Sequence, residues 1–275
     1  MSSNDIRDRL ELTSILDSRE KATIEVYTLG QFSVRINGRE VNIKSWGRDK
    51  TIQLFQFLIT TRHAKGLHRE QIIDRLWGDQ MSNDGLNNFK VAVHGINKVL
   101  EPSRKSRADA KYLKRQGATY FLDMEKCWVD ADQMEALISL GNINSTIDPG
   151  LSSEAYRLAL DLHNGTFLPN RVYEDWSSEE RERLQILALG AYVALAEIEL
   201  DKAPHEAIRL AQQALLIDPV WEDAYRIQMK AYFERGNRPQ AIKTYQKCRE
   251  VLLSEFGIEP LPETKQLLNL IRNEG

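Results

Sequence analysis

The sequence has few cysteines and no long apolar run, and each shortage argues against a class of protein. Its two cysteines among 275 residues, Cys127 and Cys248, lie far apart and lack the spacing of a metal site. No stretch approaches the roughly 20 consecutive apolar residues that a membrane span requires, and residues 1–22 lack the apolar centre of a signal peptide. We therefore expect a reduced, cytoplasmic protein with no membrane partner.

Motifs of common catalytic sites are also missing. There is no glycine-rich phosphate loop ending in Gly-Lys-Ser/Thr, no HExxH and no GxSxG. The histidines show no paired metal spacing; they are His63, His68, His94, His163 and His205. Carboxylates are plentiful, but an acidic helical surface explains them without catalysis. We expect no catalytic residue, no metal and no cofactor, and hence a protein that is not an enzyme.

The net charge of −3 conceals a division along the chain. Residues 23–128 hold 18 Lys and Arg against 11 Asp and Glu, a net charge of +7. Residues 129–275 hold 15 against 24, a net charge of −9. A basic module joined to an acidic one indicates a polyanionic partner for the first alone. Chance partition of charge between two solvated surfaces is the alternative.

The basic module begins with a strand pattern. Residues 1–22 are polar and are predicted to be a frayed arm or the remnant of an upstream connection. The following stretch, IEVYTLGQFSVRINGREVNI, alternates and contains Asn37-Gly38, the strongest two-residue hairpin signal. It predicts a small antiparallel sheet over residues 24–43.

Three helices and a hairpin are predicted next. The helices are DKTIQLFQFLITTR, HREQIIDRLWG, and residues 87–100 after the capping-rich SNDG at 82–85. The stretch YLKRQGATYFLD (112–123) is typical of two strands with a turn at Gly117. Sheet, three helices and hairpin in this order predict a winged helix, whose third helix enters the major groove.

The third helix has two faces of different character. Its predicted core stripe is Phe89, Val93, Ile96 and Leu100, flanked by Ala92 and Val99. The opposite arc carries no carboxylate and consists of Asn87, Lys90, Val91, His94, Asn97 and Lys98. Amides pair with adenine edges, Lys with guanine or phosphate, and Val with the thymine methyl group. We predict that this arc contacts DNA; an ordinary solvated face is the alternative.

Basic residues continue beyond this helix. Between residues 98 and 115 they are Lys98, Arg104, Lys105, Arg107, Lys111, Lys114 and Arg115, against Glu101 and Asp109. We predict that they bind the phosphate backbone while the helix reads bases. For residues 103–110 a disordered solvated loop is the competing interpretation.

The acidic module has an all-helical pattern with an internal repeat. Ala207-Ile208 and Ala241-Ile242 lie 34 residues apart, the tetratricopeptide period. The repeat puts Gly236 at the turn glycine, and small residues where paired helices approach closely. Earlier helices around residues 152–163 and 179–200 complete a short stack. A generic helical bundle is the alternative.

These marks together resemble a known family. LGQFSVRINGREV, HREQIIDRLWGD, the helices over residues 50–61 and 87–100, and RQGATYFLD are similar to the OmpR-type winged helix of AfsR/SARP-type transcriptional regulators. NGTFLPN (164–170), EDW (174–176) and FGIEPLPET (256–264) resemble the bacterial transcriptional activation domain. The resemblance implies a surface for partner proteins, such as RNA polymerase or a sensor domain.

Three positions depart from the family pattern. Such activators usually carry arginines late in the third helix, where this chain has Gly95 and Asn97, and a glycine in the wing where Thr119 stands. The departures imply weaker or differently specified DNA binding. They also motivate a rival from another class, an interaction scaffold whose winged helix no longer reads DNA.

The predicted fold class is an α+β winged helix-turn-helix domain (23–128) followed by an all-α tetratricopeptide-like helical repeat domain (129–275). The predicted function is a sequence-specific DNA-binding regulator, an activator, with double-stranded DNA as its partner. We expect it to bind as a homodimer on direct repeats about one helical turn apart, because helix-turn-helix proteins commonly bind half-sites at that spacing. No receiver, ATPase or sensor domain is visible, so a longer regulator containing this chain is one alternative.

Overall fold

A computed structural model describes residues 3–78, 83–105 and 108–273. It separates into two compact units, each continuous in space but not in sequence. The first is formed by residues 14–133 and 164–182, and the second by residues 3–13, 134–163 and 183–273. The first unit therefore draws on a segment far along the chain, residues 164–182, which we call the strap.

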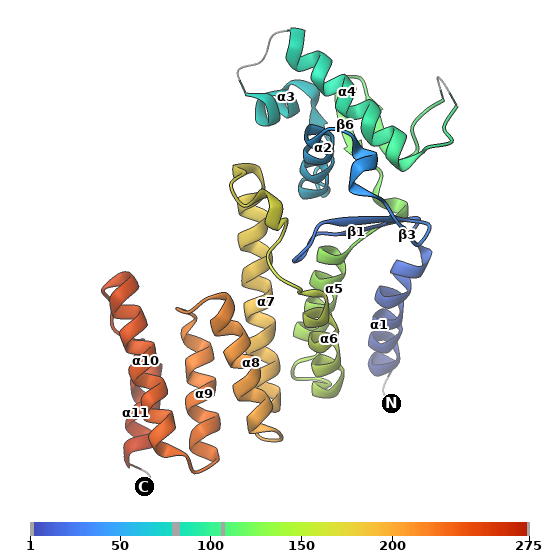
Figure 1. The fold of residues 1–275 in the computed structure, drawn as a ribbon. Helices are drawn as coiled ribbons and strands as arrows, with labels where there is room; N and C mark the ends of the chain where they lie inside the picture. The colour runs from blue at the N-terminus through green and yellow to red at the C-terminus, as the bar shows by residue number, and fades with distance from the viewer. Residues whose placement is uncertain (1–2, 79–82, 106–107, 274–275) are drawn as a thin grey trace. The chain divides into compact units, whose positions relative to one another are not determined.

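The first unit holds two sheets and three main helices (Figure 1). Its strands are β1 (Ile24–Tyr27), β2 (Ser33–Ile36), β3 (Arg39–Glu40), β4 (Leu67–His68), β5 (Leu113–Gln116), β6 (Thr119–Leu122) and β7 (Cys127–Val129). Its helices are α2 (Asp49–Thr60), α3 (Arg69–Trp77) and α4 (Asn83–Leu100), with short 3₁₀ turns η1 (Ile43–Trp46), η2 (Met124–Lys126), η3 (Pro169–Arg171) and η4 (Asp175–Ser177).

Both predicted hairpins are confirmed. In the four-stranded sheet, ordered β3-β2-β1-β7, the turn between β2 and β3 is Asn37-Gly38, with φ of 49° and 73°. Only residues that tolerate positive φ at both positions make this turn, which matches the twist of the flanking strands. The second sheet, ordered β4-β6-β5, turns at Gly117 with φ of 63°. Together with α2, α3 and α4 it completes a winged helix.

Helix α2 is buried along most of its length, because α4, η1, β6 and η4 all pack against it. All nine residues from Thr51 to Ile59 are buried. Helix α4 packs against it, and the strap supplies polar partners for its glutamines. Gln53 donates to the Glu174 carboxylate at 2.7 Å, and Gln56 donates to the Asn170 side-chain oxygen at 3.2 Å.

The strap is also joined to the sheet. The backbone N–H groups of Gly30 and Leu168 donate to the carbonyls of Thr166 and Thr28 at 3.0 and 2.8 Å. The compact units therefore divide the chain differently from the predicted boundary between residues 128 and 129, because the strap folds back onto the first unit.

Residues 1–22, predicted to be a frayed arm or the remnant of an upstream connection, contain a 19-residue helix, α1 (Ser3–Lys21). Its last turn is held within the first unit, where the Arg19 guanidinium donates to Glu25 at 2.9 Å and lies 5.2 Å from the Trp128 ring centroid. The apolar stripe of this segment is thin, so these polar and cation–π contacts were not visible in its periodicity.

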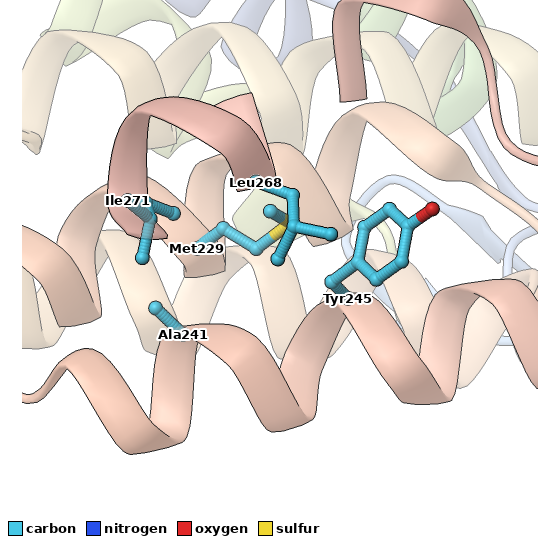
Figure 2. Close-up of a cluster of buried hydrophobic side chains, with 5 residues drawn as sticks. All are labelled: Met229, Ala241, Tyr245, Leu268 and Ile271. Carbon is cyan, nitrogen blue, oxygen red and sulfur yellow. The ribbon is translucent and has the colours of Figure 1, made fainter. Parts of the chain in front are cut away.

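The second unit is helical. Its elements are α6 (Pro149–Leu162), α8 (Pro204–Ile217), α9 (Glu222–Glu234), α10 (Arg238–Phe256) and α11 (Pro262–Asn273); the unit boundaries fall inside α1, α5 (Asp130–Asn144) and α7 (Ser178–Glu199). The repeat positions Ala207 and Ala241 are fully buried, as is Ala214, and Gly236 has φ of 71° at the turn between α9 and α10. Figure 2 shows the core that this pairing makes, with Met229, Ala241, Tyr245, Leu268 and Ile271 gathered from α9, α10 and α11.

Two cysteines, Cys127 and Cys248, are free thiols, and burial raises the pKa of each to about 12. Across the described ranges, none of the helices combines the length and apolar character needed to cross a bilayer.

Candidate nucleic-acid interface

Helix α4 is anchored by its predicted apolar stripe. Phe89 and Ile96 are fully buried, and the Phe89 ring packs edge-on against Tyr120 of the wing with centroids 4.9 Å apart. Ala92, Val99 and Leu100 are buried beside them, while Val93 is half-buried. The stripe fixes the rotation of α4 about its axis, and so decides which residues face outward.

Gly95 allows the close approach of α4 to α2. A Cβ atom at this position would lie 2.7 Å from the Cγ2 atom of Thr51, closer than real Cβ atoms come to a neighbour. Any larger residue must push the two helices apart or displace Thr51. The departure of Gly95 from the family pattern is therefore a packing feature.

The opposite flank of α4 is exposed. At 100° per residue, Asn87, Lys90, Val91, His94 and Lys98 fall within an arc of about 100°, and all five are exposed, Val91 to 47%. We call these five residues the α4 flank. The set combines amide, ammonium, imidazole and methyl groups, which suits the mixed chemistry of base edges.

Asn97 does not belong to this flank. It is 7% exposed, and its Oδ1 atom has no hydrogen-bond partner among the described residues. It lies about 80° from Asn87 around the helix axis, at the margin where α4 packs against the rest of the module. The sequence-based prediction of an exposed Asn97 is therefore corrected: its side chain is packed inside the module.

Helix α4 also begins four residues before the predicted start. Its first turn includes the exposed Asp84, one turn before Asn87. A carboxylate there is favoured by the positive end of the helix dipole. The carboxylate-free stretch therefore runs from Gly85 to Leu100, between Asp84 and Glu101. The predicted capping residue Ser82 lies outside the described residues.

In the wing, Arg115 lies next to α4. Arg115 is exposed, its Nε atom donates to the Gly117 carbonyl at 2.7 Å, and its guanidinium lies 5.8 Å from the Tyr120 ring centroid. Tyr120 itself touches Phe89 of α4. Arg115 is thus held beside the helix by the turn and by an aromatic ring.

The other predicted basic residues surround a separate hollow of about 850 Å³. Arg104, Lys105, Lys111 and Lys114 line it together with Lys126, but so do Glu101, Asp109, Asp123 and Glu125. Lys114 is paired with Asp123 at 3.8 Å, and the Glu101 carboxylate accepts from the backbone N–H of Lys111 at 2.7 Å. Acidic neighbours thus offset much of this positive charge. Arg107 lies outside the described residues.

A smaller hollow of about 400 Å³ adjoins the α4 flank and includes residues that the sequence analysis missed. Arg48 and Asn88 line it with Val91, and Lys50 donates to the Leu76 carbonyl at 2.5 Å. Arg48 comes from the start of α2, so no periodicity within α4 could have found it. Within the described ranges, no group of three or more His, Cys, Asp and Glu is arranged to hold a metal ion.

Comparison with known proteins places this geometry in a family. The model of the bacterial transcriptional activator domain matches residues 129–272, more than half of the chain. The chain belongs to the bacterial transcriptional activator domain family. The match spans the strap as well as the helical repeats, so the family's domain supplies part of the winged-helix unit.

Relatives within the family extend the similarity to the winged helix. Regulatory protein AfsR of Streptomyces coelicolor is 26% identical over 198 residues, 72% of this chain and 19% of AfsR. Regulatory protein DnrI of Streptomyces peucetius is 27% identical over 208 residues, 73% of this chain and 75% of DnrI. The chain thus matches a fifth of the first relative's length and three quarters of the second's. The resemblance to AfsR/SARP-type regulators is confirmed.

A solved structure has a similar fold. Mycobacterium tuberculosis EmbR, in complex with a low-affinity phosphopeptide, superposes with a TM-score of 0.78 at 19% identity, covering 91% of this chain and 65% of EmbR. At this identity the likeness concerns the fold, a winged helix joined to a tetratricopeptide-like helical region.

Proposed function

We propose that this family member is a cytoplasmic, sequence-specific DNA-binding activator of transcription. The α4 flank enters the major groove, and the wing binds the adjacent phosphate backbone. In this arrangement Lys90, His94 and Lys98 lie nearest the bases or phosphates. The family's regulatory relatives support the class of function.

The observation that carries the proposal is the α4 flank. Five exposed side chains share one arc of an anchored helix, and the sequence has no Asp or Glu between residues 87 and 98. A solvated helix normally mixes both signs of charge along its exposed face. Val91, exposed at one end of this arc, is suited to a thymine methyl group and is otherwise unfavourable in water.

The helical repeats are the proposed surface for protein partners, RNA polymerase or a sensor domain. EmbR was captured with a phosphopeptide, which supports a protein ligand for this fold type. Two copies bound to direct repeats about one helical turn apart would place both α4 helices on one side of the duplex.

The scaffold alternative was motivated by Gly95 and Asn97. Both residues have packing roles, Gly95 against Thr51 and Asn97 at the buried margin of α4. Their identity therefore does not count against DNA contact by the exposed neighbours. No other observation favours the scaffold.

A salt series with random duplex DNA tests the proposal. We expect binding at about 50 mM salt that weakens with a log–log slope near 0.9 per phosphate contacted. Selection of bound duplexes from a random library should then yield a consensus site. Absence of binding at low salt would favour the scaffold.

Variants of the α4 flank distinguish sequence-specific base contacts from non-specific electrostatic binding to DNA. Replacing Lys90 and His94 by alanine should relax the selected consensus, with a loss of about 1–3 kcal/mol per base contact. Lys243→Ala, on the exposed face of α10 in the other unit, is the matched control and should leave the consensus unchanged. An identical consensus from both variants would count against the proposed role of the flank.

A further inference from the structure

Arg69 and Arg115 are both joined to the turn of the wing hairpin. Leu67 of β4 pairs with Tyr120 of β6, and Tyr120 pairs with Arg115 of β5, so these three residues form one row across the sheet. Arg69 follows β4 directly as the first residue of α3, and its backbone N–H donates to the Ala118 carbonyl at 2.8 Å. The neighbouring turn residue Gly117 accepts from the Arg115 Nε atom at 2.7 Å, so the two arginines approach the same turn from the two outer strands.

The row of Leu67, Tyr120 and Arg115 is on the side of the sheet turned toward α4. The Tyr120 ring packs edge-on against Phe89 of α4, and the Arg115 guanidinium lies 5.8 Å from the Tyr120 ring centroid. Strands are spaced by about 4.8 Å, so β4 and β5 stand about 10 Å apart with β6 between them. The two arginines therefore flank the hairpin turn at the edge of the surface that α4 presents.

Among the described residues, neither of these two arginines has a strong ion pair. The acidic partner of Arg69 is its sequence neighbour Glu70, at 3.8 Å and two-thirds exposed, and an exposed pair of this kind contributes little free energy. The buried Nε atom of Arg69 has no hydrogen-bond acceptor among the described residues, although the side chain as a whole is 30% exposed. Arg115 forms no ion pair with any described residue. Its Nε atom donates a hydrogen bond to the Gly117 carbonyl, which is a neutral group.

Arg62 in the same unit provides the contrast. Its side chain is 0% exposed and is bound by Asp132 and Glu180. An arginine that serves only the fold is satisfied in this way, with its planar donors matched to carboxylates. Arg69 instead has a buried Nε atom but a partly exposed side chain, and the exposed Arg115 stacks on the Tyr120 ring. Side chains held in this way can bind an oxyanion from outside the protein.

We propose that Arg69 and Arg115 form a clamp for the DNA backbone, each binding a phosphodiester oxygen next to the groove that α4 enters. The clamp rests on the proposed function and adds Arg69 to it. In helix-turn-helix proteins the helix before the recognition helix crosses the backbone. Phosphate contacts of this kind fix the register of the protein on the duplex and carry no sequence information.

The test uses the full chain and a random duplex labelled for fluorescence anisotropy. Arg69→Gln should weaken binding roughly five- to tenfold at about 0.1 M salt and lower the log–log salt slope by about 0.9. Arg115→Gln should do the same, and the double variant should lower the slope by about 1.8. Arg39→Gln, an exposed arginine of the other sheet, removes the same charge and should leave the slope unchanged. Arg69→Lys should retain most of the log–log salt slope of the wild type, because a lysine on the phosphate still displaces a counterion from the DNA.

A second measurement uses only the wild-type protein, so a variant that fails to fold cannot affect its result. Phenylglyoxal modifies accessible arginines, and peptide mass spectrometry reads each site. Saturating random duplex should protect Arg69 and Arg115 but leave the rate at Arg39 unchanged. Equal modification of Arg69 with and without DNA, or an Arg69→Gln slope equal to that of the wild type, overturns the clamp while leaving the proposed function intact. Absence of wild-type binding at about 50 mM salt overturns both.

Discussion

The guanidinium of Arg171 donates to the Gln56 side-chain oxygen at 2.8 Å, although 115 residues separate them along the chain. The same guanidinium forms two bonds to Asp49, at 2.5 and 3.1 Å. Gln56 is fully buried within α2, the helix on which α4 packs. The strap is therefore a structural part of the winged helix, although it lies within the family's activator domain.

Replacing Arg171 by alanine leaves the Gln56 oxygen buried without this donor. A buried acceptor without a partner costs about 1–3 kcal/mol, so the free energy of unfolding should fall by that amount. Urea unfolding followed by tryptophan fluorescence measures it, because Trp176 of the strap packs on Phe57 of α2. Arg235→Ala, at the exposed end of α9, should change stability by less than about 0.5 kcal/mol. Equal stabilities of the two variants would show that the strap contributes nothing here.

Arg62 should be more sensitive still. Burial alone would lower the pKa of its guanidinium, but hydrogen bonds and charge from Asp132 and Glu180 raise it above its ordinary value. Arg62→Ala leaves both carboxylates without their cation, and we expect a loss of about 3 kcal/mol in unfolding free energy. The exposed Arg75 of α3 is the matched control, with less than about 0.5 kcal/mol lost on replacement by alanine. Chemical denaturation of both variants decides the matter; a loss below about 1 kcal/mol for Arg62→Ala contradicts the prediction.

Gly95→Ala tests the contact between α4 and α2. Alanine is the better helix former by about 1 kcal/mol, but its Cβ atom would overlap Thr51, and overpacking costs about 1–3 kcal/mol. We expect a net loss of about 1 kcal/mol. Gly190→Ala in α7 meets no atom within 4 Å and should instead stabilise by about 0.5–1 kcal/mol.

A second change at Thr51 sharpens that test. Thr51→Ser removes the Cγ2 atom, which would lie 2.7 Å from a Cβ atom at residue 95, so the double variant should recover part of the loss. Thermal melting of the wild type, both single variants and the double variant measures the coupling. Strictly additive effects would mean that the two residues do not compete for space.

The pH dependence of stability should contain a contribution from His163. Burial lowers the pKa of this imidazole below its ordinary value, and its ring packs edge-on against Tyr192 with centroids 6.4 Å apart. Between the lowered folded pKa and the unfolded value near 6.5, the unfolded state binds more protons. Stability is therefore full above about pH 6.5 and falls as the pH drops through that range.

Urea unfolding from about pH 7.5 to about pH 5.5 measures this contribution. The neutral His163→Phe variant should lose less stability over the range than the wild type. The exposed His205 provides a control, since His205→Phe should keep the wild-type pH profile. Parallel profiles for the wild type and His163→Phe would contradict the assignment.

Local signals in the sequence predicted most of the first unit. The Asn37-Gly38 turn and the apolar period of Phe89 and Ile96 each depend on neighbours a few positions away. In the second unit, the small residues Ala207 and Ala241 were predicted from the 34-residue repeat. The α4 flank followed from the apolar period of α4, apart from its margin, where Asn97 is covered by elements that periodicity within α4 does not describe.

The strap could not be predicted in this way. Gln53 and Gln56 stand three apart in α2, the spacing of an ordinary solvated face. Their partners Glu174 and Asn170 lie more than 100 residues further on. A buried glutamine differs from an exposed one only through the tertiary contact that satisfies it. Arg69 was missed for a related reason, since its place beside Arg115 depends on strand pairing between β4 and β6.

The place of the strap in the chain has a consequence for synthesis on the ribosome. Residues 14–133 emerge first, but the part of the α2 covering that the strap supplies is missing until residues 164–182 follow. At about 5–20 residues per second, the delay of some 50 residues lasts roughly 3–10 seconds. During that interval Gln53, Gln56 and Phe57 lack their partners in the strap. We therefore expect the nascent winged helix to mature only after its distant segment has been translated.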